Sequence, residues 1–105
     1  MRDGQRPKIK NLKDMAIINK KCWPEFFEKF CSGERTLELR LADFDLKTDD
    51  ILVLEEYNPE TKQYTGRKAE FVCRKVERSA QNPLQFYKVE DVEKYGFWVI
   101  ELEKK

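Results

Sequence analysis

Residues 32–40, SGERTLELR, contain the alternating pattern on which the predicted fold depends. A glycine closes a short aromatic segment, and leucines then alternate with charged side chains. Alternation with a period of two is typical of a β-strand with one buried face, so the leucines are expected to face the core. Glu38 and Arg40 then share the opposite face, and Arg35 lies just before the strand.

These three charges allow two interpretations. Two guanidinium groups can hold phosphate or carboxylate oxygens through paired hydrogen bonds, while a carboxylate accepts the N–H edge of a base. Such a trio suits a nucleotide or an unpaired base in RNA. The alternative is a set of ion pairs on a solvated face, each contributing less than about 1 kcal/mol. Spacing alone favours the ion pairs, because any half-buried strand shows alternating charges.

The composition is typical of one folded domain. A chain of 105 residues is long enough for a modest core and too short for two. Charged residues make up 39%, hydrophobic residues 40% and aromatic residues 12%, whereas a disordered chain would be short of aromatics. Glu and Lys dominate the charges, a bias similar to that of thermophile proteins.

Positive charge gathers near the start of the chain. Residues 1–21 hold seven Lys and Arg against two Asp, a net charge of +5, so with a whole-chain charge of +1 the remainder carries −4. We expect residues 1–7 to form a flexible basic arm and residues 8–105 a single domain. The arm region, with Lys8, Lys10 and Lys13, is suited to contact phosphates or an acidic partner. A solvated terminus without a partner is the alternative.

Several classes of function are disfavoured. No apolar run is long enough to span a bilayer, and the segment 15–18 is too short for a signal peptide, so we expect a cytoplasmic protein without membrane contact. Three cysteines without CxxC spacing indicate reduced thiols. The sequence has no histidine, which excludes Ser-His and Cys-His catalysis and argues against zinc. We expect no metal, no cofactor and a monomer.

Residues 22–33 are predicted to form a helix of two to three turns. Pro24 suits the first helical position, and Gly33 suits a left-handed helix end. Four aromatic residues fall on one face of this helix. At helical spacing such a stripe is more often core than a base-stacking platform. They are Trp23, Phe26, Phe27 and Phe30.

The remaining segments predict a mostly β domain. Residues 51–57 and 64–76 read as a hairpin with a turn at 58–61 and a bulge at Gly66. A helical turn over 89–95 closes at Gly96. Short strands are expected at 15–19 and 36–42, and a last strand at 97–102 with its Trp and Ile inward. Four or five strands and one substantial helix predict a small, mostly β (α+β), barrel-like domain with one or two short helices.

Two motifs resemble a known family. Residues 33–40, GERTLELR, resemble the G-x-K-x-x-E-x-R signature of the ASCH domain, a branch of the PUA-like β-barrel superfamily. Residues 50–57, DILVLEEY, and 64–67, YTGR, are similar to the strand and hairpin of a small ASCH-like branch. The order of elements matches from about residue 22 to 102. The resemblance implies a PUA-like barrel that binds RNA or a nucleotide beside the helix.

The resemblance points to a set of ligand-binding residues. They are Arg35, Glu38, Arg40, Tyr57 and Arg67. For the last two, which flank the hairpin, an ordinary cross-strand pair is an equal alternative. Phe44 stands where the branch often has an arginine; it could stack a base or simply pack. Asp49 replaces the usual glycine and tolerates a left-handed turn.

The same resemblance brings an enzyme hypothesis. Some small ASCH proteins resemble amidohydrolases that deacylate acetylated cytidine with a lysine, a threonine and a glutamate. Here the lysine position is Arg35 and the threonine position is Glu38, while the resemblance points to Glu90 as the counterpart of the glutamate. Arginine does not release its proton, so a non-catalytic module is favoured and no catalytic residue is assigned. A hydrolase acting on an acylated nucleoside and a protein-interaction domain are the alternatives.

Overall fold

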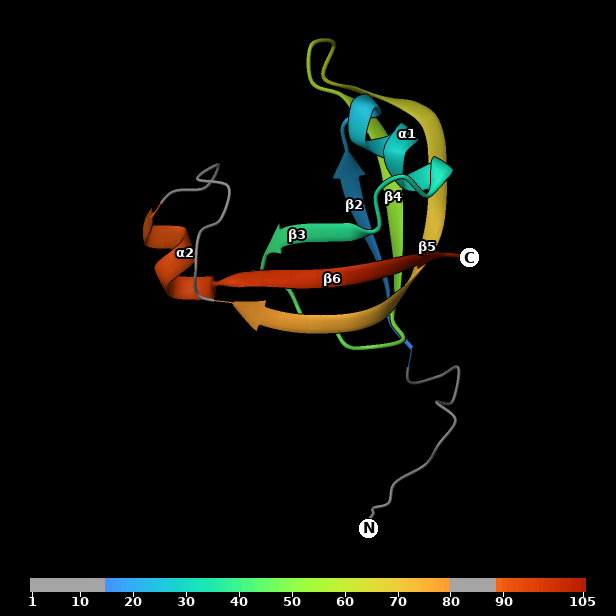
Figure 1. Ribbon diagram of the computed structural model, residues 1–105. Helices are drawn as coiled ribbons and strands as arrows, with labels where there is room; N and C mark the ends of the chain where they lie inside the picture. Colours follow the sequence, from blue (N-terminus) through green and yellow to red (C-terminus); the bar gives the residue numbers. More distant parts are fainter. Residues whose placement is uncertain (1–14, 80–88) are drawn as a thin grey trace.

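The computed structural model describes residues 15–79 and 89–105. Their elements follow the order β2, α1, β3, β4, β5, α2, β6 (Figure 1). The bounds are β2 Ile17–Cys22, α1 Pro24–Ser32, β3 Leu37–Leu41, β4 Ile51–Asn58, β5 Gln63–Ser79, α2 Val89–Tyr95 and β6 Phe97–Lys104. The expected arm, residues 1–7, and the lysines at 8, 10 and 13 lie outside the described residues.

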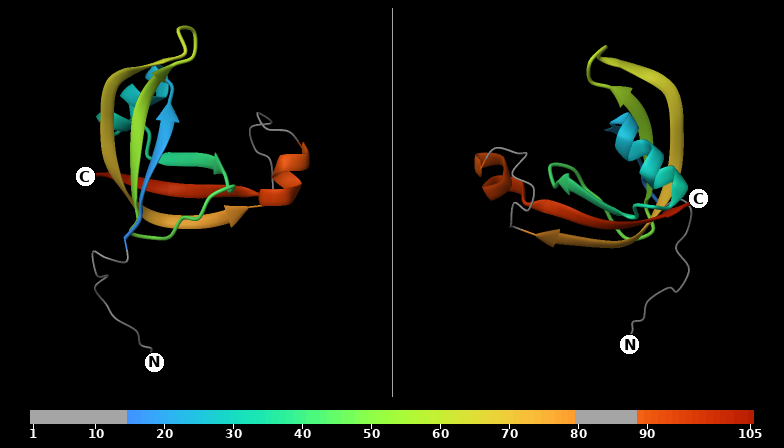
Figure 2. Two further views of the ribbon diagram at one scale, coloured as in Figure 1. Left: turned by 180° about the vertical axis from the view of Figure 1, so that it is seen from behind. Right: turned by 45° about the horizontal axis from the view of Figure 1, so that its top comes forward.

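The five strands form one mixed sheet in the order β2-β4-β5-β6-β3. β2 pairs with β4 in parallel, and the other neighbours are antiparallel. β5 is 17 residues long and belongs to both halves of the sheet. It curves through the sheet, and its register with β6 shifts between Cys73 and Lys75, as a bulge does (Figures 1 and 2). The result is a mostly β half-barrel with two short helices, which confirms the predicted fold class.

The core lies on the inner face of the half-barrel. Laterally paired residues project to the same side of a sheet, so the register places Leu54 of β4 beside Ala69 of β5, and Leu52 beside Phe71. Helix α1 packs against this face, near the β4–β5 hairpin (Figure 2). The buried cluster comprises Cys22, Phe27, Phe30, Leu46, Leu52, Leu54, Phe71, Cys73, Ile100 and Leu102.

Helix α1 confirms the predicted start and end signals. Pro24 stands in the first turn, and Gly33 ends the helix in the left-handed conformation at φ 82°. The aromatic stripe, however, is divided. Phe27 and Phe30 are buried, whereas Phe26 is half-buried and Trp23 is exposed. Only the second half of the stripe therefore enters the core.

The connections follow the predicted turn chemistry. Asp49 adopts φ 78°, the left-handed conformation expected of it. The buried carboxylate of Asp50 accepts backbone N–H bonds from Ala16 (3.0 Å) and Lys47 (2.9 Å), which fixes the entry to β4. In the hairpin turn, the side-chain oxygen of Asn58 accepts the N–H of Glu60 (2.9 Å). The strand predicted at 15–19 is displaced, and occupies Ile17–Cys22.

Helix α2 ends at Gly96, as predicted, with φ 75°. The Gly96 N–H donates to Val92, and its carbonyl accepts the N–H of Ala42 after β3. Within residues 15–79 and 89–105, no helix has both the length and the apolar character needed to cross a membrane.

Candidate functional site on the inner face

The side chains of β3 face the opposite way from the sequence prediction. Glu38 pairs with Ile100 and Arg40 with Trp98, so both charges project to the inner face where Ile100 is buried. Glu38 is 8% exposed, whereas Leu37 is 48% exposed on the outer face. The prediction that the leucines of this strand are hidden in the core is therefore wrong. The charges of Glu38 and Arg40 lie on the inner face of the half-barrel.

Arg40 connects the two edge strands of the sheet. Its Nε donates to Glu38 Oε2 at 2.9 Å, and its Nη2 donates to the carbonyl oxygen of Lys21 in β2 at 2.6 Å. Glu38 Oε1 also accepts the N–H of Leu39 (3.1 Å). Because β2 and β3 are the first and last strands in the sheet order, this side chain spans the opening that backbone pairing leaves. A salt bridge between groups so little exposed depends on good hydrogen-bond geometry.

Arg35 approaches the same region from the turn after α1. Its guanidinium lies 4.9 Å from the ring centroid of Phe26 and 5.7 Å from that of Phe30, which are cation–π distances. Its Nε also donates to the carbonyl of Leu37 in a long bond of 3.4 Å. The guanidinium therefore lies against the aromatic side of α1.

Cys22 is the last residue of β2 and follows Lys21, whose carbonyl oxygen accepts the bond from Arg40. Burial raises the pKa of its thiol to about 12, and the negative charge of Glu38 adds to the increase. The positive charges of Arg40 and Arg35 act in the opposite direction. Glu38 and Arg40 are bonded to each other, Arg40 is bonded to the residue before Cys22, and Arg35 lies on the aromatic side of α1. We name these four residues the inner-face cluster.

Two residues that the sequence analysis did not select lie beside this cluster. Lys20 pairs in register with Leu54, so it projects to the inner face, and its Nζ lies 3.8 Å from the ring centroid of Phe44. Trp98 donates from Nε1 to the carbonyl of Phe44 at 2.7 Å, which holds the loop after β3. A period of two from Ile18 places Lys20 and Cys22 on one face, and this was the signal available in the sequence. Phe44 therefore packs against the Lys20 ammonium.

Arg67 belongs to a second polar cluster. Its Nη2 lies 2.8 Å from Glu28 of α1 and its Nε 3.6 Å from the buried Glu56, and the pKa of Arg67 is raised chiefly by its hydrogen bond to Glu28. The hydroxyl of Thr65 donates to Glu56 at 2.6 Å. None of these contacts involves Arg35, Glu38 or Arg40. The structure thus places Arg67 in a group of its own.

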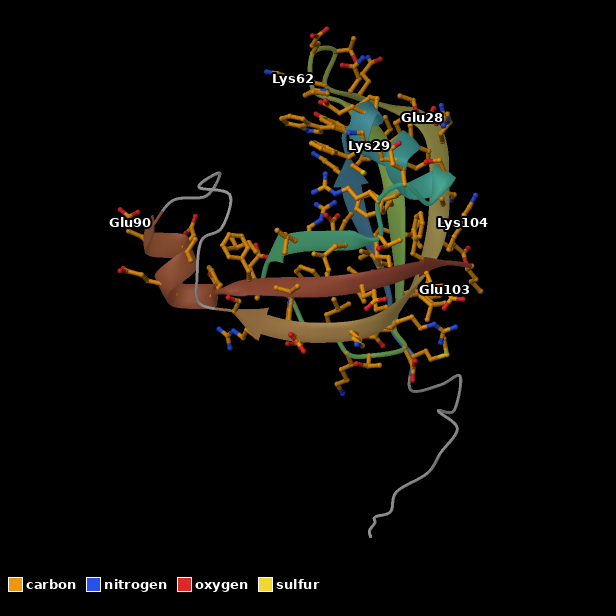
Figure 3. All side chains as sticks on the ribbon, in the orientation of Figure 1. Glu28, Lys29, Lys62, Glu90, Glu103 and Lys104 are labelled. Atoms are coloured by element: carbon orange, nitrogen blue, oxygen red, sulfur yellow. The ribbon has the colours of Figure 1, made fainter. Side chains whose placement is uncertain are left out.

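This second cluster borders a groove between α1 and β5. Its volume is about 530 Å³, and its lining includes Phe27, Cys31, Arg67 and Lys104. Figure 3 shows Glu28 on α1 and Lys104 near the C-terminus, at the side of the molecule where α1 meets β5.

Tyr57 faces away from the inner-face cluster. It pairs with Tyr64, and the two rings meet edge to face with centroids 5.1 Å apart. The ammonium of Lys21 lies 4.3 Å from the Tyr57 ring. By register, Lys21 lies opposite Glu55 on the outer face, whereas Cys22 lies opposite Glu56 on the inner one. Of the five predicted ligand residues, the structure therefore gathers three and separates Tyr57 and Arg67 from them.

A half-barrel sheet with buried charges on its inner face defines the fold class, and comparison with known proteins defines the family. The model of the DUF3850 family, described as a domain of unknown function, matches residues 18–91. The chain belongs to this family. A search of curated proteins finds no match. The crystal structure of hypothetical protein PH0355 is similar, with a TM-score of 0.66 and 20% identity over 85% of this chain and 99% of that one. This similarity shows the fold alone.

Proposed function

We propose that this protein is a non-catalytic module that binds RNA or a nucleotide at the inner-face cluster. The observation that carries the proposal is the direction of β3, which places Glu38 and Arg40 inside the half-barrel instead of on its solvated face. Burying ionised groups costs free energy even when they are paired, so the link from Arg40 to β2 carries a penalty that an apolar contact would not. Charged groups in such positions are candidates for functional sites.

The charge balance of the region supports an anionic ligand. Glu38 is the one carboxylate in a group of four charged residues with Lys20, Arg35 and Arg40, which leaves two positive charges in excess within this group. Guanidinium groups bind phosphate oxygens through paired N–H donors, and the Arg35 plane can also stack on a base. Glu38 would read a base N–H. A ligand that binds Arg40 has to compete with the hydrogen bonds from Arg40 to Glu38 and to the carbonyl of Lys21.

The family resemblance supports the same proposal. We assign the DUF3850 fold of this chain to the ASCH branch of the PUA-like superfamily on its GERTLELR and DILVLEEY motifs. For that superfamily, RNA or nucleotide binding is the usual inference. Hydrolysis is less well supported, since Arg35 and Glu38 occupy the lysine and threonine positions, and Glu90 lies exposed on α2 (Figure 3). Cytoplasmic location and a monomeric state remain part of the proposal.

The test compares two arginine variants by fluorescence anisotropy with a labelled single-stranded RNA. Arg35→Gln removes a charge at the site, and Arg74→Gln removes an equal charge from an exposed pair with Glu103. We expect Arg35→Gln to weaken binding at least tenfold and Arg74→Gln to leave it near the wild-type value. Affinity should also fall steeply with salt, as counterion release requires. Equal affinity of both variants, or a flat salt response, would count against the proposal.

A parallel assay separates binding from hydrolysis. The wild-type protein should release no carboxylic acid from any member of a panel of acylated nucleosides. Turnover that is lost in Glu38→Gln would replace the binding proposal with the amidohydrolase alternative.

A further inference from the structure

Trp23 is a large aromatic side chain held at the surface. It is 50% exposed, although it begins the stripe whose later members enter the core. Its ring lies 6.5 Å from that of Phe26 at an interplanar angle of 28°, so the two rings are stacked. One face of this pair is therefore supported by the protein, while much of the Trp23 ring remains open to solvent.

The stack continues into the proposed binding site. The Arg35 guanidinium lies 4.9 Å from the Phe26 ring on the way from α1 to β3. Trp23, Phe26 and Arg35 form a row of flat groups, which we name the rim row. It runs from Trp23, the residue before α1, to Arg35, two residues before β3. Flat π-faces beside a guanidinium are the surface on which unpaired bases stack.

A second exposed aromatic lies near the same end of β2. Tyr64 is 53% exposed and rests edge to face against Tyr57. The Lys21 ammonium lies 5.9 Å from the Tyr64 ring and only two residues before Trp23 in the chain. Figures 1 and 2 show α1 and the β4–β5 hairpin at one end of the molecule. The Lys21 ammonium therefore lies beside the Tyr57–Tyr64 pair, and the end of β2 leads from Lys21 to Trp23.

We infer that the ligand is a single strand of RNA several nucleotides long, and not a free mononucleotide. One base stacks on Trp23 at the end of the rim row, another stacks on Tyr64, and Lys21 contacts the phosphate between them. This inference rests on the proposed function and deepens it. A mononucleotide has one base and satisfies one platform, whereas a strand can pass around the end of the edge strand β2, from Tyr64 on the outer face to Trp23 and the rim row.

The two tryptophans allow the two regions to be observed separately. Trp98 is half-buried, pairs in register with Arg40, and reports on the inner-face cluster. Trp23 reports on the rim row. Trp98→Phe and Trp23→Phe each leave one tryptophan, so quenching by uridine monophosphate and by uridine oligomers of two, four and eight nucleotides can be assigned to one site. Anisotropy with labelled oligomers measures affinity in the wild-type protein independently of either reporter.

We expect the Trp23 emission to be quenched by the four- and eight-nucleotide oligomers and not by uridine monophosphate at equal nucleotide concentration. Trp23→Ala should weaken oligomer binding about tenfold to a hundredfold, the range of one base–aromatic stack, and Tyr64→Ala should weaken it as well. The control is Ile17→Ala, which removes a 68% exposed side chain from β2, the strand that precedes Trp23. It should bind like the wild type.

The outcomes distinguish the two proposals. If affinity does not grow with oligomer length, and Trp23→Ala binds as well as Ile17→Ala while Arg35→Gln is still impaired, the extended strand is wrong and the proposed function stands. If neither the monophosphate nor any oligomer binds the wild-type protein, both are wrong.

Discussion

The guanidinium of Arg40 is bonded at once to Glu38 in its own strand and to the carbonyl of Lys21 in the strand at the other edge of the sheet. The two distances, 2.9 and 2.6 Å, are those of charge-assisted hydrogen bonds. No backbone ladder joins β2 to β3 in this sheet. The Arg40 side chain therefore links the two edge strands of the half-barrel.

Arg40→Met should destabilise the protein by about 2–4 kcal/mol, because it leaves the carboxylate of Glu38 buried without its partner. The double variant Glu38→Leu/Arg40→Met should recover much of that loss, since an apolar pair carries no desolvation penalty. Urea unfolding followed by circular dichroism measures both free energies. A double variant less stable than Arg40→Met alone would contradict this account of the pair.

Thr65→Val should cost about 1–2 kcal/mol of stability. The Thr65 hydroxyl donates to Glu56, and removing this donor leaves the buried Oε1 with a longer contact, 3.6 Å, to Arg67. Thr61→Val is the matched control, since Thr61 is exposed in the hairpin turn. Its change should stay within about 0.5 kcal/mol. If the two variants unfold at the same urea concentration, the bond to Glu56 is not a significant contributor.

Local signals in the sequence predicted most elements of the fold. Pro24 and Gly33 bounded α1, Gly96 ended α2, and the polar turn at 58–61 separated the hairpin strands. These features depend on the conformational preferences of single residues, which act over a few positions of the chain. The boundaries could therefore be predicted without knowing what the elements pack against.

The orientation of β3 could not be predicted in this way. A period of two separates Glu38 and Arg40 from the leucines, but it does not say which set faces the core. That choice is made by the register with β6 and by the curvature of β5, both set by residues distant in sequence. The bond from Arg40 to Lys21 likewise joins positions 19 residues apart. The gathering of three predicted site residues thus emerged only in the structure.

Gly96→Ala should destabilise the protein more than Gly33→Ala does. Both glycines have a left-handed φ, which costs other residues about 1–2 kcal/mol. At Gly33 an added Cβ meets open space, but at Gly96 it would lie 2.8 Å from the carbonyl oxygen of Ser79. Thermal unfolding of the two variants gives the comparison. Equal melting temperatures would show that the backbone around Gly96 moves aside without cost.

The buried thiols of Cys22 and Cys73 should make stability fall at alkaline pH. Burial raises the pKa of each to about 12 from an ordinary value of 9.0. Between these values the unfolded chain releases both thiol protons and the folded protein keeps them, so the unfolded state is favoured as pH rises. The contribution of the two buried thiols to the free energy of unfolding is fully present below about pH 9. It declines above that by up to about 1.4 kcal/mol per pH unit for each thiol.

Urea unfolding between about pH 8 and 10.5 tests this expectation, with variants that isolate each thiol. Cys73→Ala should be less stable than the wild type at pH 8, since it leaves a cavity in the core, and the difference should shrink as pH rises because the variant has one fewer thiol to titrate. Cys31→Ala, which keeps both buried thiols, should follow the wild-type slope. A constant difference between the wild type and Cys73→Ala over this range would mean that the Cys73 thiol ionises as readily in the folded protein as in the unfolded chain.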